Sequence, residues 1–261
     1  MKHTILTILG SLLMVFTSCE TFEEEEVICL PVNVTTTLVQ GTDTKKLIAD
    51  FHYIPGTGRL DHITRSNHQT HYFEYDADGR IMVVRMKKVD TKIQDEMWFH
   101  YDGPLVDEVI LVKRNLDYIY LEPLDSVYAG VVEFDYNGRD IIGETRSEVT
   151  PDGQREEVVW LVEYAYDING NITSSKAFDP RSSSGKSVTM TYDGHKHPFS
   201  GLHYYFTGES FVNNLLSRSV ESEGIRYNYE LELNEYGYPD MVYEKLGTTY
   251  SRIIRYSYMS K

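Results

Sequence analysis

Apolar or aromatic residues alternate with polar residues along several stretches of this chain. In residues 227–233 every odd position is Tyr or Leu, and every even position is Asn or Glu. Residues 132–136, 188–192 and 254–258 show the same alternation. A two-residue period is typical of a β-strand with one buried face and one solvated face, as in antiparallel sheets. We therefore expect an all-β protein.

The alternating stretches recur as a loose repeat, in which an aromatic strand is followed by a turn. The clearest copy runs from Phe73 to Ile81, with Asp78 and Gly79 in its turn. An Asp or Asn before Gly supplies the positive φ that reverses the chain, so each copy predicts a β-hairpin. Less regular copies begin at Phe51, Phe99, Phe134, Tyr164, Met190 and Leu231. Residues 255–258 form a half copy without a turn.

Eight aromatic strands, most of them with a return strand, give roughly fourteen to sixteen strands. A closed barrel of that number is too wide for side chains to fill, yet the inward positions are Tyr, Val, Ile and Leu. We therefore expect a single domain over residues 36–261, in which an antiparallel meander of hairpins forms a large curved, partly flattened or incompletely closed barrel-like sheet. The acidic strand faces suit water better than the apolar outward band of a membrane-spanning barrel. Residues 211–220 are a weak candidate for a short helix.

The first residues have the features of a secretory signal over residues 1–18. Lys2 precedes a mostly apolar run at residues 5–16, which is too short to span a bilayer. Small residues directly before Cys19 resemble the lipobox of bacterial lipoproteins, which implies cleavage before Cys19 and lipidation of that residue. An ordinary signal peptide with a chance Cys is the alternative. Several acyl chains on Cys19 would anchor the protein stably to a membrane.

An acidic tether, residues 19–35, is expected after the anchor. Five of the seven residues from Glu20 to Glu26 are Glu. Like charges repel and keep such a segment extended. The run resembles the acidic export tag of surface-exposed lipoproteins from Bacteroidota-type bacteria, and a plain charged tether is the alternative.

The amino-acid composition limits which classes of binding partner we expect. The 261 residues include 25 Lys and Arg against 40 Asp and Glu, for a formal net charge of −15. Nucleic-acid binding needs clustered cations, so we expect no nucleic-acid partner. Two cysteines exclude a disulfide-rich scaffold. With Cys19 lipidated, Cys29 stands alone among apolar neighbours, and we expect a buried thiol.

The repeat, the lipobox and the acidic run together resemble a known group of proteins. Aromatic strands with Asp-Gly turns resemble YD repeats. The whole chain resembles a family of uncharacterised gut-bacterial lipoproteins, a domain of unknown function with a porin-like fold. Residues 192–202 and the pair Asn213 and Asn214 also resemble this family. The resemblance implies an outer-membrane lipoprotein exposed at the cell surface, with a periplasm-facing protein as the alternative, and it implies no catalytic residues.

Candidate metal and cofactor motifs are incomplete. Asp76–Gly79 and Asp167–Gly170 resemble half of a calcium loop, but alignment puts Arg85 and Ala165 at ligand positions. His195 and His197 would share one face of a strand, yet zinc needs three or four ligands and no Cys or carboxylate completes the set nearby. We find no nucleophile elbow, phosphate loop or dinucleotide fingerprint. We therefore expect no metal, no cofactor and turn chemistry at both Asp-x-x-Gly segments.

Two tryptophans are the scarcest large side chains. Trp160 lies in an apolar run, residues 158–162, that predicts a core position. Trp98 lies on the polar face of its strand, next to Phe99, and is the better candidate for stacking on a sugar ring. A packed cross-strand aromatic is the alternative for Trp98.

These features favour a non-catalytic, surface-anchored lipoprotein that binds a partner, either a glycan or an envelope protein. We expect no enzyme activity. One alternative is a carbohydrate-active hydrolase with paired carboxylates in the concave face of the sheet, since forty acidic residues offer many pairs. Another alternative is an envelope scaffold without a small ligand.

Overall fold

The computed structural model describes residues 28–89, 93–115, 126–150, 153–182, 185–200 and 212–260. Within these residues no helix is long and apolar enough to cross a membrane. The described chain forms sixteen strands and one short 3-10 helix. They are β1 (Cys29–Gln40), β2 (Asp43–Tyr53), β3 (Leu60–Arg65), β4 (Gln69–Tyr75), β5 (Ile81–Lys88), β6 (Ile93–Asp102), β7 (Leu105–Asn115), β8 (Ser126–Asn137), β9 (Asp140–Val149), β10 (Arg155–Tyr166), β11 (Ile172–Phe178), β12 (Gly185–Lys196), β13 (Asn213–Val220), η3 (Glu221–Glu223), β14 (Ile225–Leu233), β15 (Pro239–Leu246) and β16 (Thr249–Ser260).

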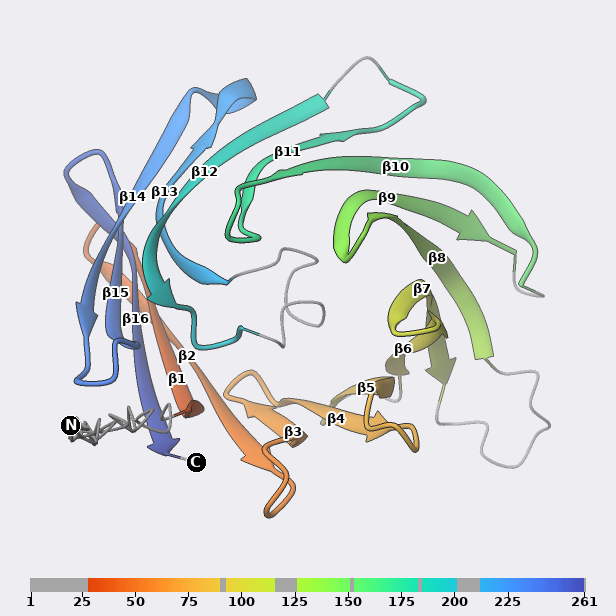
Figure 1. Cartoon of the computed structure of the whole chain (residues 1–261), viewed down its shortest axis with the longest axis horizontal. Coiled ribbons are helices and arrows are strands. Elements are labelled where there is room, and N and C mark those ends of the chain that lie inside the picture. The colour runs from red at the N-terminus through yellow and green to blue at the C-terminus, as the bar shows by residue number, and fades with distance from the viewer. Residues whose placement is uncertain are drawn as a thin grey trace, which may run out of the picture.

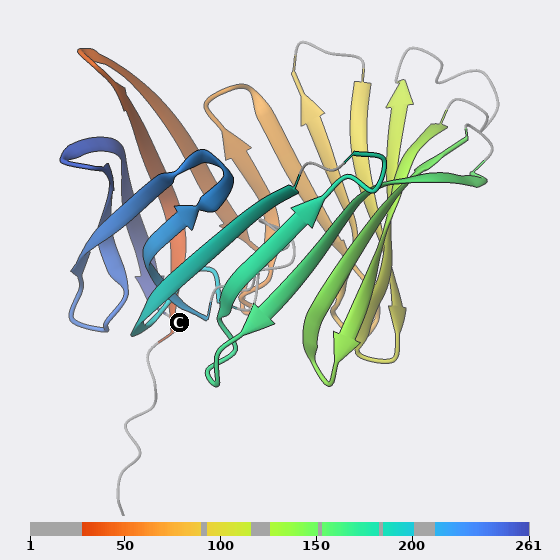
Figure 2. The same cartoon turned by 90° about the horizontal axis from the view of Figure 1, so that it is seen from above.

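The strands form one antiparallel meander that closes into a barrel (Figures 1 and 2). Each strand pairs with its neighbours in sequence, and β1 pairs with β16 from Cys29 opposite Ser260 to Leu38 opposite Arg252. The predicted all-β meander is therefore confirmed. The predicted incomplete closure is wrong, because the first and last strands complete the ring.

The repeat explains why the ends meet. An aromatic strand and the return strand after it make one hairpin unit, and β2 to β15 supply seven such units. The half copy at residues 255–258 lies in β16, and its return strand is β1. The eighth unit is thus divided between the two ends of the chain, so barrel closure uses the same pairing as every hairpin.

A register shift occurs at the same place in all eight units. Next to the pair formed by the last tyrosine of the aromatic strand, or by Leu233 in β14, the return strand contains one extra residue, as between Tyr75 opposite Ile81 and Glu74 opposite Val83. Such a β-bulge bends the strand and increases its twist, which a closing sheet requires. The extra residues are Val32, Asp61, Met82, Asp107, Ile142, Thr173, Leu216 and Asp240.

Tyrosine hydroxyls join neighbouring units. In seven units the last tyrosine of the aromatic strand donates to the carbonyl of the residue just before the extra residue of the preceding return strand, and we call these contacts the tyrosine belt. The donor–acceptor pairs are Tyr53–Pro31, Tyr75–Leu60, Tyr101–Ile81, Tyr136–Val106, Tyr166–Ile141, Tyr192–Ile172 and Tyr258–Pro239, with oxygen–oxygen distances of 2.6 to 2.8 Å. In β14 the corresponding residue is Leu233, which cannot donate. Burial raises the pKa of Tyr75 to about 12, so its hydroxyl keeps the proton that it donates.

The inner face of the wall carries the apolar core. Four phenylalanines lie two positions before belt tyrosines, and each is at most 8% exposed. They are Phe51, Phe73, Phe99 and Phe134, and they pack with Leu60, Ile63, Val84, Val109 and Val132. A second cluster contains Ile172, Val188, Met190 and Val220. The alternation in the sequence therefore places aromatic residues toward the lumen.

The turns use the chemistry expected from the repeat. In the β4–β5 turn the Oδ1 atom of Asp76 accepts from the main-chain N–H of Arg80, and Gly79 has a φ of 81°. Asp167 accepts from Asn171 in the same way in the β10–β11 turn. No group of three His, Cys, Asp or Glu residues that could hold a metal ion occurs in the described ranges.

Two details depart from the predicted segments. The weak helix candidate at residues 211–220 is wrong, because Asn213–Val220 is strand β13, paired with β12 and β14. Strand β1 starts at Cys29 and so crosses the predicted boundary at residue 36. Cys29 is a free, buried thiol, as predicted, and burial raises its pKa.

We predict that Tyr75→Phe lowers the free energy of unfolding by about 1 kcal/mol, since a buried carbonyl loses its donor. Tyr72→Phe is the matched control, because Tyr72 lies on the same strand, points outward and is 46% exposed. Urea unfolding measures both. Equal destabilisation by the two substitutions would contradict a structural role for the tyrosine belt.

Candidate functional site inside the barrel

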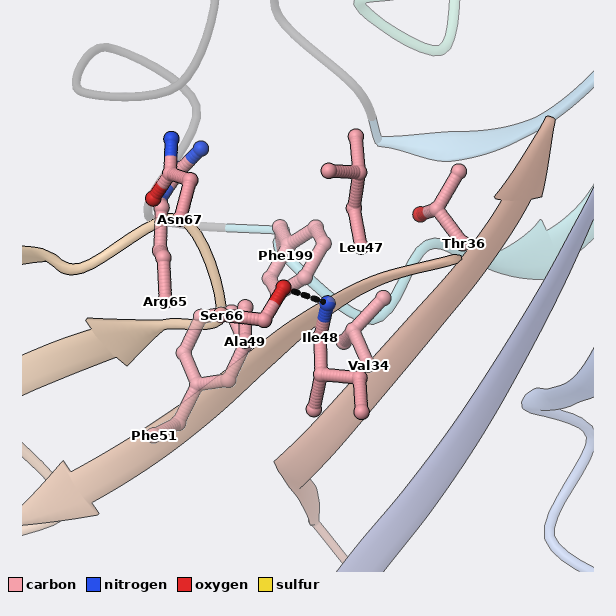
Figure 3. Close-up of a pocket in the computed structure, with 10 residues that line it drawn as sticks. All are labelled: Val34, Thr36, Leu47, Ile48, Ala49, Phe51, Arg65, Ser66, Asn67 and Phe199. Atoms are coloured by element: carbon pink, nitrogen blue, oxygen red, sulfur yellow. Dashed lines mark hydrogen bonds between the residues drawn. The ribbon is translucent and has the colours of Figure 1, made fainter. Parts of the chain in front are cut away.

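Residues 197–200, the described segment directly after β12, extend into the lumen (Figure 1). The ring of Phe199, in this segment, packs against the inner core (Figure 3). The Phe199 ring stacks on Phe51 of β2, with centroids 5.5 Å apart, and meets the edge of Tyr256 of β16 at 6.1 Å. An aromatic side chain from the β12–β13 connection therefore occupies space that the wall residues leave open.

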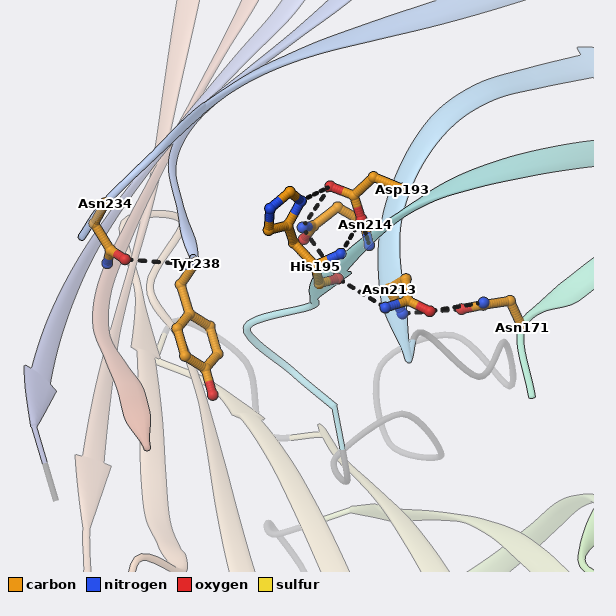
Figure 4. A network of polar contacts seen from close by, with 7 residues as sticks. All are labelled: Asn171, Asp193, His195, Asn213, Asn214, Asn234 and Tyr238. Carbon is orange, nitrogen blue, oxygen red and sulfur yellow. Dashed lines mark hydrogen bonds and ion pairs between the residues drawn. The ribbon is translucent and has the colours of Figure 1, made fainter. Parts of the chain in front are cut away.

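A polar network fixes the base of this connection (Figure 4). The Oδ1 atom of Asp193 accepts from the main-chain N–H groups of His195 and Asn214, at 2.9 and 3.0 Å. The side-chain amide of Asn214 donates to Asp193 Oδ2 at 3.1 Å. The side chain of Asn213 donates to the carbonyl of His195 and accepts from Asn171 Nδ2, at 3.0 and 2.9 Å. The two asparagines of β13 thus hold both ends of the connection together.

Phe199 lines a first cavity of about 220 Å³ (Figure 3). The lining is mostly apolar and includes Val34, Leu47, Ala49 and Phe51. Arg65 also lines it, and its Nε atom is buried without a hydrogen-bond partner in the described chain. This cavity therefore has an apolar wall and one cationic side chain.

A second cavity of about 260 Å³ lies between the base of the connection and strands β13 to β16. We call it the arginine cavity, because Arg218 and Arg252 both line it. Its other lining residues are His197, Asn214, Leu215, Tyr229, Leu231, Pro239, Val242, Glu244, Ile254 and Tyr256. The cavity therefore combines an apolar floor with several convergent polar groups, as ligand sites do.

Glu244 organises the polar side of the arginine cavity. It is 6% exposed, and it accepts from Ser251 Oγ at 2.7 Å and from Tyr229 at 3.1 Å. Arg252 Nε lies 3.7 Å from Glu244 Oε1, which is an ion pair but too long for a hydrogen bond. Burial and Glu244 raise the pKa of Tyr229, while Arg218 and Arg252 act to lower it. Both arginines therefore lie within electrostatic reach of the same hydroxyl group.

His197 lies where the connection borders this cavity. Its Nδ1 atom accepts from the main-chain N–H of Phe199 at 3.2 Å. Burial lowers the pKa of His197 to about 4, and the Asp193 carboxylate opposes this shift. His197 is therefore neutral at pH 7 and acts as an acceptor.

A second, half-buried carboxylate lies elsewhere on the inner face of the wall. Glu144 of β9 accepts from the Tyr164 hydroxyl at 3.0 Å, and burial raises the pKa of Glu144 despite this bond. Strands β10 to β14 separate β9 from β15, the strand that carries Glu244.

Trp160 belongs to the inner face near Glu144, but it is 38% exposed, so its predicted core position is wrong.

The predicted functional residues lie outside this site. Cys19 is outside the described residues. Trp98 lies on the outer face of β6, where its indole N–H donates to Glu96 at 2.7 Å and covers a carboxylate that is 1% exposed. The ligand-binding role of Trp98 stays a prediction, and the structure gives this side chain a packing role on that face.

Sequence reasoning missed the arginine cavity, although one signal was present. Arg252 lies two residues before Ile254 and four before Tyr256, so the alternation of the strand places all three side chains on the inner face. Arg218 faces Met190 across the β12–β13 pair, and Met190 belongs to the buried core. A charged residue at an inward position is the signal that could have identified the site.

Comparison with known structures supports the fold. A porin-like protein from Bacteroides vulgatus has a TM-score of 0.53 and 11% identity, over 88% of this chain and 99% of that chain. This chain has a porin-like fold. A porin-like protein from Bacteroides uniformis matches 88% of this chain and 98% of that chain at 11% identity, with a TM-score of 0.44. The structure of TcdB2-TccC3 without its hypervariable C-terminal region has a TM-score of 0.29 and 12% identity, and the match covers 83% of this chain and 12% of that chain. No protein-family model and no curated protein matches the sequence.

We predict that acid destabilises the barrel partly through His197. Its pKa is about 4 in the folded state, below the unfolded value of about 6.5, so the unfolded state takes up the proton first. The His197 contribution is complete above pH 6.5 and is lost as the pH falls toward 4, by about 2 kcal/mol at pH 5. His197→Gln should therefore lose less stability than the parent protein between pH 7 and pH 5.

Thermal melting across that range measures the difference. His100→Gln is the control, because the side chain of His100 is 51% exposed on the outer face. An unchanged pH dependence in His197→Gln would contradict the burial of a neutral imidazole at this position.

Proposed function

We propose that this chain is a non-catalytic, lipid-anchored envelope protein that binds a glycan inside its barrel. The observation that carries the proposal is the arginine cavity, in which apolar side chains meet polar groups from four strands and from the inserted connection. Pockets of this composition are the usual places for small ligands.

The outer surface of the barrel suits water. Its strands carry ion pairs such as Arg85 with Glu74, Lys245 with Glu230, and Arg155 with Glu133. A barrel that spans a membrane requires an apolar outward band and a polar lumen. Here the phenylalanines and the belt tyrosines point inward instead, which supports a lipid anchor at Cys19 as the means of membrane attachment.

The position of β1 indicates which rim of the barrel would face the membrane if Cys19 carries a lipid. Strand β1 starts at Cys29, on the rim that also carries the belt tyrosines and the short turns. A lipid on Cys19 therefore places the tyrosine belt toward the membrane and the opposite rim away from it. The porin-like fold is compatible with an envelope protein of this kind.

Hydrolysis receives less support than binding. Glycoside hydrolysis needs two carboxylates that flank one bond, separated by about 5–10 Å. Glu244 is the one carboxylate residue that lines the two lumen cavities described above. Glu244 also accepts from two hydroxyl groups, an arrangement typical of a structural carboxylate.

The full chain, expressed with its signal and purified in detergent, tests the proposal on a glycan array. We expect specific glycan binding that Phe199→Leu weakens about tenfold or more, because the Phe199 ring packs against Tyr256, which lines the arginine cavity. Trp98→Ala, on the outer face, should leave the binding unchanged. Absence of any bound glycan, or loss of binding in Trp98→Ala alone, would overturn a lumen site.

Membrane attachment is tested separately. Metabolic labelling with radioactive palmitate should label the parent protein, and Cys19→Ala should abolish both the label and recovery in the membrane fraction. Cys29→Ala is the control, since Cys29 is a buried thiol in the barrel wall. Labelling that survives Cys19→Ala would contradict the anchor.

A further inference from the structure

The arginine cavity carries an unusual charge for this protein. The chain as a whole has a formal net charge of −15. The cavity instead contains two guanidinium groups, one carboxylate and a neutral His197, and so its net charge is positive. A positively charged cavity in an acidic protein favours an anion over a neutral or cationic ligand.

The arginines retain hydrogen-bonding capacity. The Nε atoms of Arg218 and Arg252 are buried, and no group of the described chain accepts a hydrogen bond from either. The two oxygens of Glu244 already accept from Ser251 and Tyr229. Buried donors of this kind are costly when they are unpaired, and an arginine fork matches the two oxygens of a carboxylate.

An acceptor lies on the same cavity wall. Asn214 Nδ2 donates to Asp193 Oδ2 and to the carbonyl of His195, at 3.1 and 3.4 Å, which fixes the orientation of the amide. The Oδ1 atom of Asn214 is buried and receives no hydrogen bond from the described chain. The cavity therefore presents two cationic donors and one neutral acceptor.

The remaining lining is apolar or aromatic. Leu231, Val242, Ile254 and Tyr256 form a surface that suits the less polar face of a pyranose ring. At about 260 Å³ the cavity lies below the range of about 300–1,000 Å³ that is typical of drug-sized ligands, so it suits a group the size of one sugar unit.

We infer that the arginine cavity binds an acidic sugar unit of the uronic-acid type. Its carboxylate lies between Arg218 and Arg252, and one of its hydroxyl groups donates to Asn214 Oδ1. This inference rests on the proposed glycan-binding function and names the chemical class of the ligand. A neutral hexose offers the guanidinium groups hydroxyl and ring oxygens as acceptors, but it lacks the negative charge and the paired oxygens of a carboxylate.

The test is calorimetric titration of the detergent-solubilised, lipidated full chain with glucuronate and galacturonate. Glucose, galactose and inorganic phosphate are the comparison ligands. We expect at least one uronate to bind about tenfold or more tightly than its neutral counterpart and than phosphate. A tenfold difference in affinity corresponds to the free energy of one charge-assisted hydrogen bond. Phosphate binding as strong as that of both uronates would overturn the sugar assignment.

Substitutions locate the binding. Arg218→Gln and Arg252→Gln should each weaken uronate binding about tenfold or more, and Arg252→Lys should weaken it less, because it keeps the charge but loses the fork. Arg255→Gln is the matched control, since Arg255 lies on the same strand and is exposed. Should the Gln variants fail to fold, added salt should weaken uronate binding to the parent protein.

The outcomes separate the two proposals. A chain that binds a neutral glycan on the array but no uronate would overturn the acidic-sugar inference and leave the proposed function standing. A chain that binds no glycan of any kind would overturn both. Uronate binding that is unchanged in both Arg→Gln variants, or that is independent of salt, would also overturn the inference.

Discussion

The hydrogen bond from a tyrosine hydroxyl to the carbonyl of the preceding hairpin is the contact on which the rest of this barrel depends. Ladder hydrogen bonds set the register between adjacent strands, including strands of neighbouring units such as β3 and β4, but they leave the inner side chains without a link from unit to unit. A belt tyrosine provides this link, since its ring packs inward while its hydroxyl reaches one defined acceptor, as in Tyr101 to Ile81. Seven such bonds, with a β-bulge beside each acceptor, set the same offset around the ring.

Closure of the ring creates the interior that the site requires. Because β1 and β16 complete a unit, the inner face has no free edge and the aromatic side chains surround a lumen. Sixteen strands leave more space than wall side chains fill, and Phe199 from the β12–β13 connection occupies part of it. The tyrosine belt has a gap at Leu233 of β14. Strand β14 lies next to β13, which follows this connection, and Asn213 and Asn214 of β13 hold the backbone there through hydrogen bonds.

Local sequence patterns predicted the strands and their inward faces well, because alternation and Asp-Gly turns act over a few residues. Closure was not predictable, since pairing of Val34 with Tyr256 joins positions far apart in the chain. The short stretch at 213–220 lacks aromatic alternation, and so its strand was mistaken for a weak helix. The arginine cavity could not be predicted from the sequence, because it depends on three-dimensional proximity between β13, β15 and β16. The core position predicted for Trp160 was wrong because an apolar run can line a lumen as well as a core.

Hydrogen exchange of the strands that close the ring tests the account most directly. In a closed barrel residues 33–38 of β1 and 252–255 of β16 are paired with a neighbouring strand on both sides, so their main-chain N–H groups have carbonyl partners. We predict that peptides covering these residues exchange as slowly as those from β6 and β7 in the middle of the sheet. Fast exchange in both terminal strands, with protection kept in β6 and β7, would show an open sheet with free edges and would contradict the account.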